Sequence, residues 1–172
     1  MKVLFLDIDG VLNGHEWDDE AKSCNIRREC VKHLNRVVRE TGCRIVLSSA
    51  WRYIVHGGDM TTRGFGYMLR THGLLADGGT VNLILGITDR DADPLVLGES
   101  DVGERGRQCR AWVDRWHGLG KAVLPLECFV AVDDEDHDFS AAGVLAVITD
   151  GKKGLTEADA DRLIGILNGV KV

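Results

Sequence analysis

The sequence predicts a doubly wound, Rossmann-like α/β fold, in which a parallel sheet carries helices on both faces. Two observations support this: short apolar runs of strand length recur along the chain, and segments with helical periodicity separate them. Right-handed crossovers would bring the carboxyl ends of such strands to one edge of the sheet, where open α/β sheets bind ligands. The expected strands are residues 2–7, 43–48, 81–87, 128–132 and 144–148.

Four segments carry helical signals. Residues 27–41 place apolar side chains on one face and are followed by Gly42, which suits a helix C-terminus. Residues 60–72 are a weaker prediction, because two glycines interrupt the pattern. Residues 104–117 again gather apolar side chains on one face, and Thr156 opens a capping box before a last helix.

The length favours a single domain spanning residues 1–172. Residues 13–26 and 53–80 provide the only room for a substrate cap, so we expect a minimal cap, with a small insert at 53–80. Glycines within 53–80 favour loops over a closing lid, and residues 88–104 also read as a loop.

The composition argues against several classes of protein. A net charge of −6 and a pI of about 5.5 disfavour a strongly basic grip on nucleic acid. The 5 cysteines form no CxxC pair, which disfavours a zinc site or a disulfide framework and suits a reducing cytoplasm. No apolar stretch approaches the roughly 20 residues needed to cross a bilayer. We therefore expect a cytoplasmic protein without a membrane partner.

An acid pair directly follows the first strand. Asp7 and Asp9 flank Ile8 at the end of an apolar run, and Gly10 then lets the chain turn away. Two carboxylates so close repel each other unless a cation or a proton lies between them. Mg²⁺ takes oxygen ligands and commonly partners phosphate, so the pair indicates Mg²⁺ as a cofactor.

Further polar motifs follow at the expected ends of elements. They are the hydroxyls Ser48 and Ser49, the bases Arg105 and Arg107, and the acids Asp133 and Asp134. This order of acid pair, hydroxyl, base and acid pair resembles the four signature motifs of the haloacid dehalogenase (HAD) superfamily of phosphotransferases. The resemblance spans most of the chain. The run Ser48-Ser49-Ala50-Trp51-Arg52 also resembles the SSxWR segment of small HAD domains associated with nucleic-acid repair.

The resemblance implies a role for each motif residue. Asp7 would be the nucleophile that forms an aspartyl-phosphate, and Asp9 would protonate the leaving oxygen and then deprotonate the attacking water. An aspartate at this second position is typical of HAD phosphatases rather than of the dehalogenase or ATPase branches. Ser48 would hydrogen-bond a phosphoryl oxygen, with Ser49 taking that role if the register slips by one.

The base and the second acid pair leave alternatives open. Arg105 is the first choice for the motif-three base, Arg107 the second and Lys121 the third. Asp134 is favoured as a metal ligand because Asp138 then falls at the spacing of the family's GDxxxD variant, and Asp133 is nearly as good a choice. The predicted catalytic residues are Asp7, Asp9, Ser48 and Arg105; the substrate-binding residues are Ser49, Arg52 and Arg107; the metal ligands are Asp7, Asp9, Asp133 and Asp134.

The resulting hypothesis is a Mg²⁺-dependent phosphomonoester hydrolase that acts through an aspartyl-phosphate. Its partner would be a phosphorylated small molecule or a nucleic-acid end, with a lean toward nucleotide or nucleic-acid terminal phosphates. Trp51 and basic residues near the cap segments would stack on a base or contact a backbone phosphate, or simply pack. The alternatives are a small-metabolite phosphatase, a phosphate-accepting signalling module and a catalytically degenerate HAD-like binding module.

Overall fold

A parallel sheet forms the centre of the protein, described here from a computed structural model for residues 1–14, 25–75, 83–88, 104–120 and 123–169. Within these residues the sheet is 5-stranded, in the order β3-β2-β1-β4-β5, and every pairing is parallel. The predicted doubly wound α/β fold is therefore confirmed. The strands are β1 (Lys2–Leu6), β2 (Arg44–Leu47), β3 (Ile84–Ile87), β4 (Cys128–Asp133) and β5 (Ala146–Ile148).

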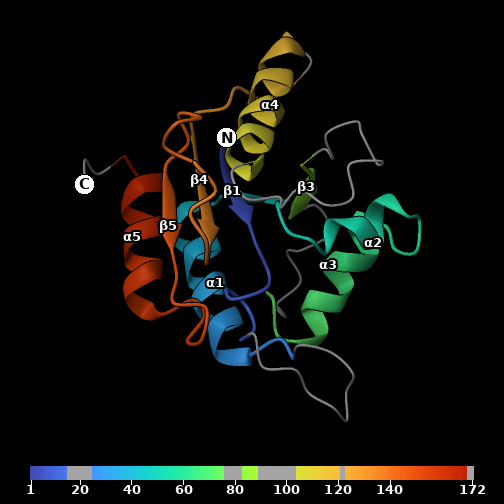
Figure 1. Cartoon of the computed structure of the whole chain (residues 1–172), viewed down its shortest axis with the longest axis vertical. Coiled ribbons are helices and arrows are strands. Elements are labelled where there is room, and N and C mark those ends of the chain that lie inside the picture. Colours follow the sequence, from blue (N-terminus) through green and yellow to red (C-terminus); the bar gives the residue numbers. More distant parts are fainter. Residues whose placement is uncertain (15–24, 76–82, 89–103, 121–122, 170–172) are drawn as a thin grey trace.

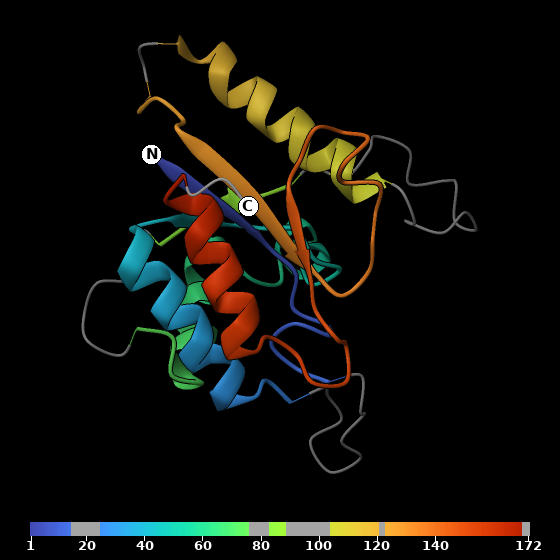
Figure 2. The same cartoon turned by 90° about the vertical axis from the view of Figure 1, so that its left-hand side faces the viewer.

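Helices cover both faces of this sheet (Figures 1 and 2). On one face α1 (Arg28–Thr41) packs beside α5 (Glu157–Leu167), whereas α4 (Glu104–Gly118) lies on the opposite face. The pleat of β1 explains the division, because successive side chains of a strand point to opposite faces. Its Leu4 and Leu6 join the core that contains α1 and α5, and its Val3 and Phe5 join the core that contains α4.

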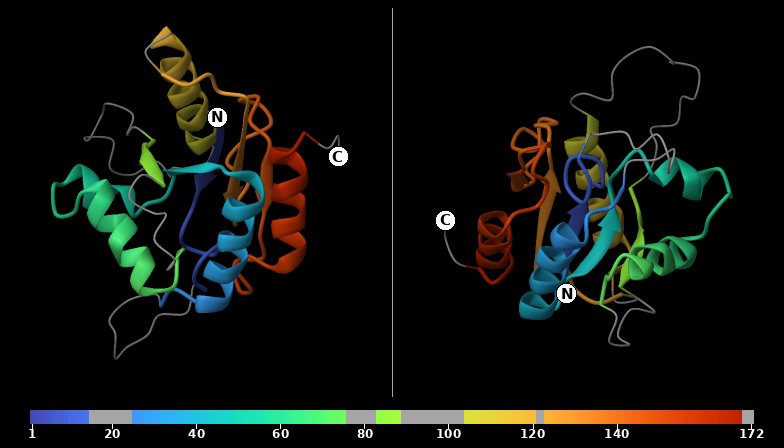
Figure 3. Two further views of the ribbon diagram at one scale, coloured as in Figure 1. Left: turned by 180° about the vertical axis from the view of Figure 1, so that it is seen from behind. Right: turned by 90° about the horizontal axis from the view of Figure 1, so that it is seen from below.

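Two further helices, α2 (Arg52–His56) and α3 (Thr62–Thr71), follow β2. Figure 3 shows α3 next to β3, and its buried Phe65 and Leu69 belong to the same core as α1. The sequence did not predict α2. The weakly predicted helix at residues 60–72 is confirmed as α3, whereas the expectation that glycines favour loops within 53–80 is wrong for this segment.

The two glycines that weakened this prediction, Gly64 and Gly66, lie within the helix. Thr61 caps the N-terminus of α3 by accepting the Gly64 N–H at 3.0 Å. A Cβ on Gly66 would lie 3.5 Å from Ile84 Cδ1, an ordinary contact distance, so this face of α3 lies directly against β3. Packing against the sheet thus compensates for the low helix propensity of glycine.

The register of the central strands brings three strand ends together. Leu6 at the end of β1 pairs with Leu47 of β2 and with Val132 of β4. The ladder continues one residue further, since the Asp7 N–H donates to Val132 O at 3.0 Å and the Ser48 N–H donates to Leu6 O at 2.8 Å. The predicted convergence of residues 7, 48 and 133 at one sheet edge is therefore confirmed.

Most predicted elements are present with shorter or shifted ends. The capping box at Thr156 is confirmed, because its hydroxyl accepts the Asp159 N–H while the Asp159 carboxylate accepts the Thr156 N–H. The predicted strand 144–148 begins only at Ala146. Residues 81–82, most of the expected loop 88–104 and Lys121 lie outside the described residues. Among the described helices, none has both the length and the apolar character needed to cross a membrane.

Candidate active site

The loop after β1 is a compact turn. Ile8 O accepts hydrogen bonds from the backbone N–H groups of Val11, Leu12 and Asn13, at 3.2, 2.8 and 3.3 Å. Gly10 has a φ of +69°, and a Cβ added there would lie 2.3 Å from the Asp134 carboxyl carbon. Glycine is therefore required at this position both for its backbone conformation and for the approach of the second acid pair.

Three carboxylates gather at the carboxyl edge of the sheet. Each of Asp7, Asp133 and Asp134 offers an oxygen, and these oxygens lie within 4.8 Å of one another. Asp7 and Asp133 are both 1% exposed, while Asp134 is partly exposed. The two candidates that the sequence left open, Asp133 and Asp134, thus occupy the same cluster.

Arg105 lies between two of these carboxylates. Its Nη1 is 2.9 Å from Asp133 Oδ2, a hydrogen-bonded ion pair, and 3.1 Å from Asp7 Oδ1, an ion pair without hydrogen-bond alignment. Burial lowers the pKa of Arg105, but Asp7 and Asp133 outweigh this effect and hold it above its usual range. The guanidinium therefore remains charged.

The adjoining glycine brings Arg105 into place. A Cβ on Gly106 would lie 2.8 Å from the backbone oxygen of His137, so α4 can begin directly against the loop that follows β4. The Gly106 N–H donates to that same oxygen at 3.2 Å. The first turn of α4 is thereby fixed beside Asp133, whereas Arg107, one residue further, is exposed.

The electrostatics of the cluster favour an added positive charge. Burial, followed by repulsion from Asp133, raises the pKa of Asp7 from 3.8 to about 7, although Arg105 and a hydrogen bond from Ser49 act in the opposite direction. Arg105 offsets only part of this effect, because the pKa of Asp7 stays raised. Clustered carboxylate oxygens are ligands that suit Mg²⁺, so the residues present fit this ion.

Asp9 lies outside this three-acid cluster. Trp51 Nε1 donates to both of its carboxylate oxygens at 3.0 Å, and Asn13 Nδ2 donates to its Oδ1 at 2.8 Å. Asp9 was predicted both as a catalytic residue and as a metal ligand. Its carboxylate instead accepts hydrogen bonds from neutral donors and is not one of the clustered acids.

The two serines after β2 have different surroundings. The Ser49 hydroxyl hydrogen-bonds Asp7 and is fully buried, whereas Ser48 Oγ lies 3.5 Å from Cys109 Sγ of α4. Since alternate side chains at a strand end point to opposite faces, a one-residue change of register exchanges them. The geometry therefore favours Ser49, the second choice, over Ser48 as the hydroxyl beside Asp7.

Arg52 was predicted to contact substrate phosphate but is completely buried. Its Nη1 donates to Ser49 O at 3.4 Å, and its guanidinium lies 5.1 Å from the centre of the Tyr53 ring. Arg52 therefore supports the backbone at Ser49, directly after β2.

Sequence reasoning missed the structural roles of three residues. Asn13 and Trp51 bind Asp9, and the buried His137 places Nε2 3.4 Å from Asp133 Oδ1. Trp51 stood within the SSxWR run that the sequence singled out, but no spacing rule indicates its contact with Asp9 across 42 residues. Thr149 is a fourth link, because its Oγ1 donates to Gly10 O at 2.9 Å and ties β5 to the first loop.

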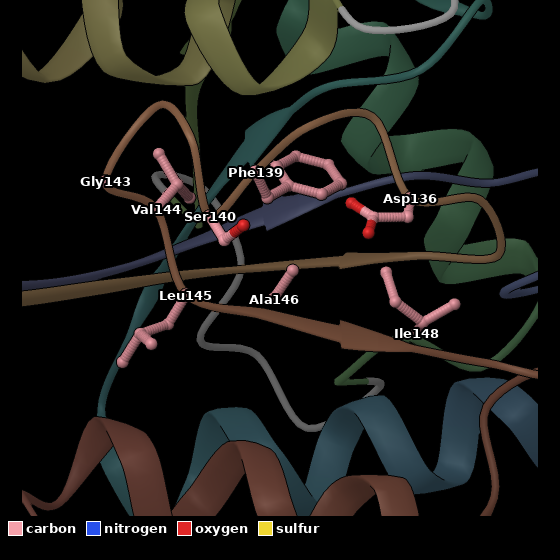
Figure 4. Close-up of a pocket in the computed structure, with 8 residues that line it drawn as sticks. All are labelled: Asp136, Phe139, Ser140, Gly143, Val144, Leu145, Ala146 and Ile148. Atoms are coloured by element: carbon pink, nitrogen blue, oxygen red, sulfur yellow. The ribbon is translucent and has the colours of Figure 1, made fainter.

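One hollow, of about 440 Å³, is separate from this cluster. It lies beside β5 and is lined largely by apolar side chains (Figure 4). It contains none of the predicted site residues. The lining residues are Asp136, Phe139, Ser140, Gly143, Val144, Leu145, Ala146 and Ile148.

The parallel sheet and the acids, base and hydroxyl at its carboxyl edge define a HAD-like domain. A family model described as the HAD domain in Swiss Army Knife RNA repair proteins matches residues 3–160, and the chain belongs to this family. Searches of curated proteins and of solved structures gave no significant match. Family membership supports a HAD-type phosphatase in general, and it confirms the resemblance inferred from the motifs.

Proposed function

We propose that this protein is a Mg²⁺-dependent phosphomonoester hydrolase that acts through an aspartyl-phosphate on Asp7. The observation that carries the proposal is the cluster of Asp7, Asp133 and Asp134, with Arg105 between two of the acids. Four kinds of group needed for phosphoryl transfer, namely a nucleophile, an acid, a hydroxyl donor and a cation, converge at one edge of the sheet.

In the first step, a carboxylate oxygen of Asp7 attacks the phosphorus atom and forms a new P–O bond. The ester P–O bond breaks, and Asp9 gives its proton to the departing oxygen, which leaves as an alcohol. Ser49 and Arg105 stand next to Asp7, where their donors can stabilise the phosphoryl oxygens.

In the second step, water attacks the same phosphorus atom. Asp9, now a carboxylate, accepts a proton from that water, and the bond between phosphorus and Asp7 breaks to release inorganic phosphate. Both aspartates thereby return to their initial states, with the acid of the first step serving as the base of the second.

Asp7, Asp133 and Asp134 are the residues that would hold Mg²⁺. When bound, this ion neutralises phosphoryl charge and orients the phosphate. His137 and the Glu135 N–H both lie next to Asp133 Oδ1, at 3.4 and 3.2 Å, and would fix the orientation of that carboxylate.

The substrate class that we propose is a terminal phosphate of a nucleotide or nucleic acid. The family description refers to RNA repair proteins, and the SSxWR run points in the same direction. A phosphate carried by a small metabolite is the main competitor. A catalytically degenerate module is disfavoured, because each motif position retains a chemically competent residue.

Phosphate release from an aryl phosphate tests the reaction. Activity should disappear with EDTA and return with Mg²⁺ but not with Ca²⁺, which prefers a larger and looser shell. Isothermal titration with Mg²⁺ should give weaker binding for Asp133→Asn and Asp134→Asn. Unchanged binding in both variants would exclude this metal site, whatever the activity.

A substrate panel tests the specificity. Nucleoside monophosphates, oligonucleotides with 3′- or 5′-phosphates and phosphosugars would be compared by kcat/KM, with Asp7→Asn as the blank. We expect the nucleic-acid substrates to be preferred. A clear preference for a phosphosugar would refute the substrate class while leaving the hydrolase proposal intact.

A further inference from the structure

We propose that Trp51 and Asn13 form a neutral clamp that positions the Asp9 carboxylate for its two proton transfers, and that Trp51 connects this carboxylate to α3. Trp51 and Asn13 are positioning residues in this scheme, because they act through Asp9. The inference rests on the proposed function and adds the part of the chain that orients its acid.

Trp51 restrains the Asp9 carboxylate through both of its oxygens. Its Nε1 is 3.0 Å from Asp9 Oδ1 and 3.0 Å from Asp9 Oδ2. A donor equidistant from both oxygens is shared between them. A turn of the carboxylate that moved either oxygen away from Nε1 would weaken this contact.

Asn13 restrains the same carboxylate from its own loop. Its Nδ2 is 2.8 Å from Asp9 Oδ1, and its Oδ1 accepts the Gly10 N–H at 3.0 Å. Since a backbone N–H can only donate, this contact requires the amide oxygen to face Gly10 and the amide nitrogen to face Asp9. Asn13 is 0% exposed, so its side chain is held by the packed loop.

Trp51 is itself held by elements on both sides. Its backbone N–H lies 3.3 Å from Ser49 Oγ, next to the hydroxyl contact with Asp7. Its ring packs edge-on against Phe65 of α3, with centroids 6.2 Å apart and an interplanar angle of 81°. Phe65 is 1% exposed and lies in the main core. The orientation of Asp9 is thereby coupled to the position of α3.

The indole and amide donors to Asp9 are neutral, unlike the guanidinium beside Asp7. Trp51 and Asn13 orient Asp9 without a full positive charge. The indole N–H is engaged in this contact, which gives Trp51 a function other than the base stacking or simple packing that the sequence left open.

The test compares Trp51→Phe with Trp116→Phe as the matched control. Trp116 Nε1 also donates one hydrogen bond, to Leu124 O at 2.9 Å, but near the opposite end of α4 from Arg105. For both variants and the wild type, kcat/KM would be measured with Mg²⁺ on phosphate esters whose leaving groups range from nitrophenol to an alkyl alcohol.

Protonation of the leaving group matters little for nitrophenol and greatly for an alcohol. We expect Trp51→Phe to lose less than about tenfold on the nitrophenyl ester and about 100-fold on the alkyl ester, because well-placed general acids contribute about 10²–10⁴-fold. Trp116→Phe should match the wild type throughout. An equal loss on all esters, or no loss, would overturn the clamp, since a purely structural defect does not depend on the leaving group.

Asn13→Asp provides a second, independent variant if Trp51→Phe fails to fold. It keeps the acceptor for Gly10 but replaces the donor to Asp9 with a second carboxylate, so it should show the same leaving-group dependence. If it instead reduces all esters equally, the proposal fails.

Nuclear magnetic resonance of the Trp51 indole separates this inference from the proposed function. Asp9→Asn should shift the Trp51 N–H resonance and leave that of Trp116 in place, with no need for turnover. An inactive wild type with this shift would refute the hydrolase but leave the contact. The clamp alone would be refuted if the wild type is active but Asp9→Asn causes no shift and the loss in Trp51→Phe does not depend on the leaving group.

Discussion

Asp7 and Asp9 are separated by one residue, yet their side chains lie in opposite electrostatic environments. Asp7 is buried among acids and beside a guanidinium, and its pKa is raised to about 7, chiefly by burial. Asp9 is partly exposed and receives hydrogen bonds from an indole and an amide. The same residue type thus has two different surroundings, which match the two roles that we propose: a nucleophile beside a cation site and a proton carrier held by neutral donors.

The division follows from the architecture. Asp7 still belongs to the ladder of β1, which directs it toward the ends of β4 and β2. Asp9 lies in the turn after the strand, where the chain has left the sheet and meets the segment after β2. Because Asp9 lies two residues after Asp7, its side chain meets Asn13 and Trp51, whereas that of Asp7 meets Arg105 and the other acids.

The largest expected effect comes from removing the nucleophile. Asp7→Asn should lower kcat by about 10⁴-fold or more, since loss of a covalent nucleophile commonly removes most of the catalysis. Release of phosphate from an aryl phosphate in Mg²⁺ measures it, with circular dichroism as the control for folding. Near wild-type turnover in this variant would mean that Asp7 does not form the intermediate.

The next effect tests the charge beside Asp7. Arg105→Gln should lower kcat by about 10²–10³-fold, comparable to the loss of one donor that stabilises a transition state. Arg107→Gln is the matched control, because it removes the same charge from an exposed position on the same helix turn. We expect it to change KM at most. Equal losses in kcat for both variants would contradict the assignment of Arg105.

The pH dependence of stability gives a smaller effect. Because the folded pKa of Asp7 is raised from 3.8 to about 7, the folded state binds this proton more tightly than the unfolded chain does. The free energy of unfolding of the metal-free protein should therefore fall as pH rises from about 4 to about 7. Mg²⁺ should then raise Tm more at pH 8 than at pH 5.

Thermal unfolding of the wild type and of Asp7→Asn, each with and without Mg²⁺, measures this dependence. The variant lacks the titrating carboxyl group of Asp7, so its free energy of unfolding should fall less between pH values of about 4 and about 7. In a domain of this size each kcal/mol corresponds to about 2–4 °C in Tm. Identical pH profiles in the two proteins would show that Asp7 is not the group responsible.

The smallest effect concerns two glycines with nearly the same backbone conformation. Gly10 and Gly42 have φ values of +69° and +67°, so alanine should strain both by roughly 1–2 kcal/mol. Only Gly10 also faces a close neighbour, Asp134, whereas nothing lies within 4 Å of a Cβ at Gly42. Gly10→Ala should therefore also weaken Mg²⁺ binding in a calorimetric titration. Equal Mg²⁺ affinity in the two variants would argue against Asp134 as a ligand.

The sequence predicted the fold and the place of the site because both depend on local patterns. Apolar runs and helical periodicity define the strands and helices, and parallel strands bring Asp7 and Asp133 together. The choice between Ser48 and Ser49 was not accessible, because it depends on where the strand ends to within one residue. The Asp9–Trp51 contact was also missed, since it forms between loops whose path no periodicity encodes.

The glycines of α3 show how helix propensity alone can underestimate a helix. Gly64 and Gly66 weaken a helix when judged by propensity alone. The helix forms nevertheless, because its Phe65 and Leu69 are buried in the main core. Local rules fail here because the stabilising contact lies on another element.

The most direct test of the account is to locate the phosphoryl group in Asp9→Asn. This variant keeps the nucleophile but lacks the base that would activate water, so it should accumulate a phosphoenzyme from a nitrophenyl ester in Mg²⁺. Rapid quenching followed by peptide mass spectrometry should place the phosphoryl group on Asp7, and EDTA should abolish it. A phosphoryl group on any other residue, or full turnover in Asp9→Asn without a trapped intermediate, would contradict the separate roles assigned to the two aspartates.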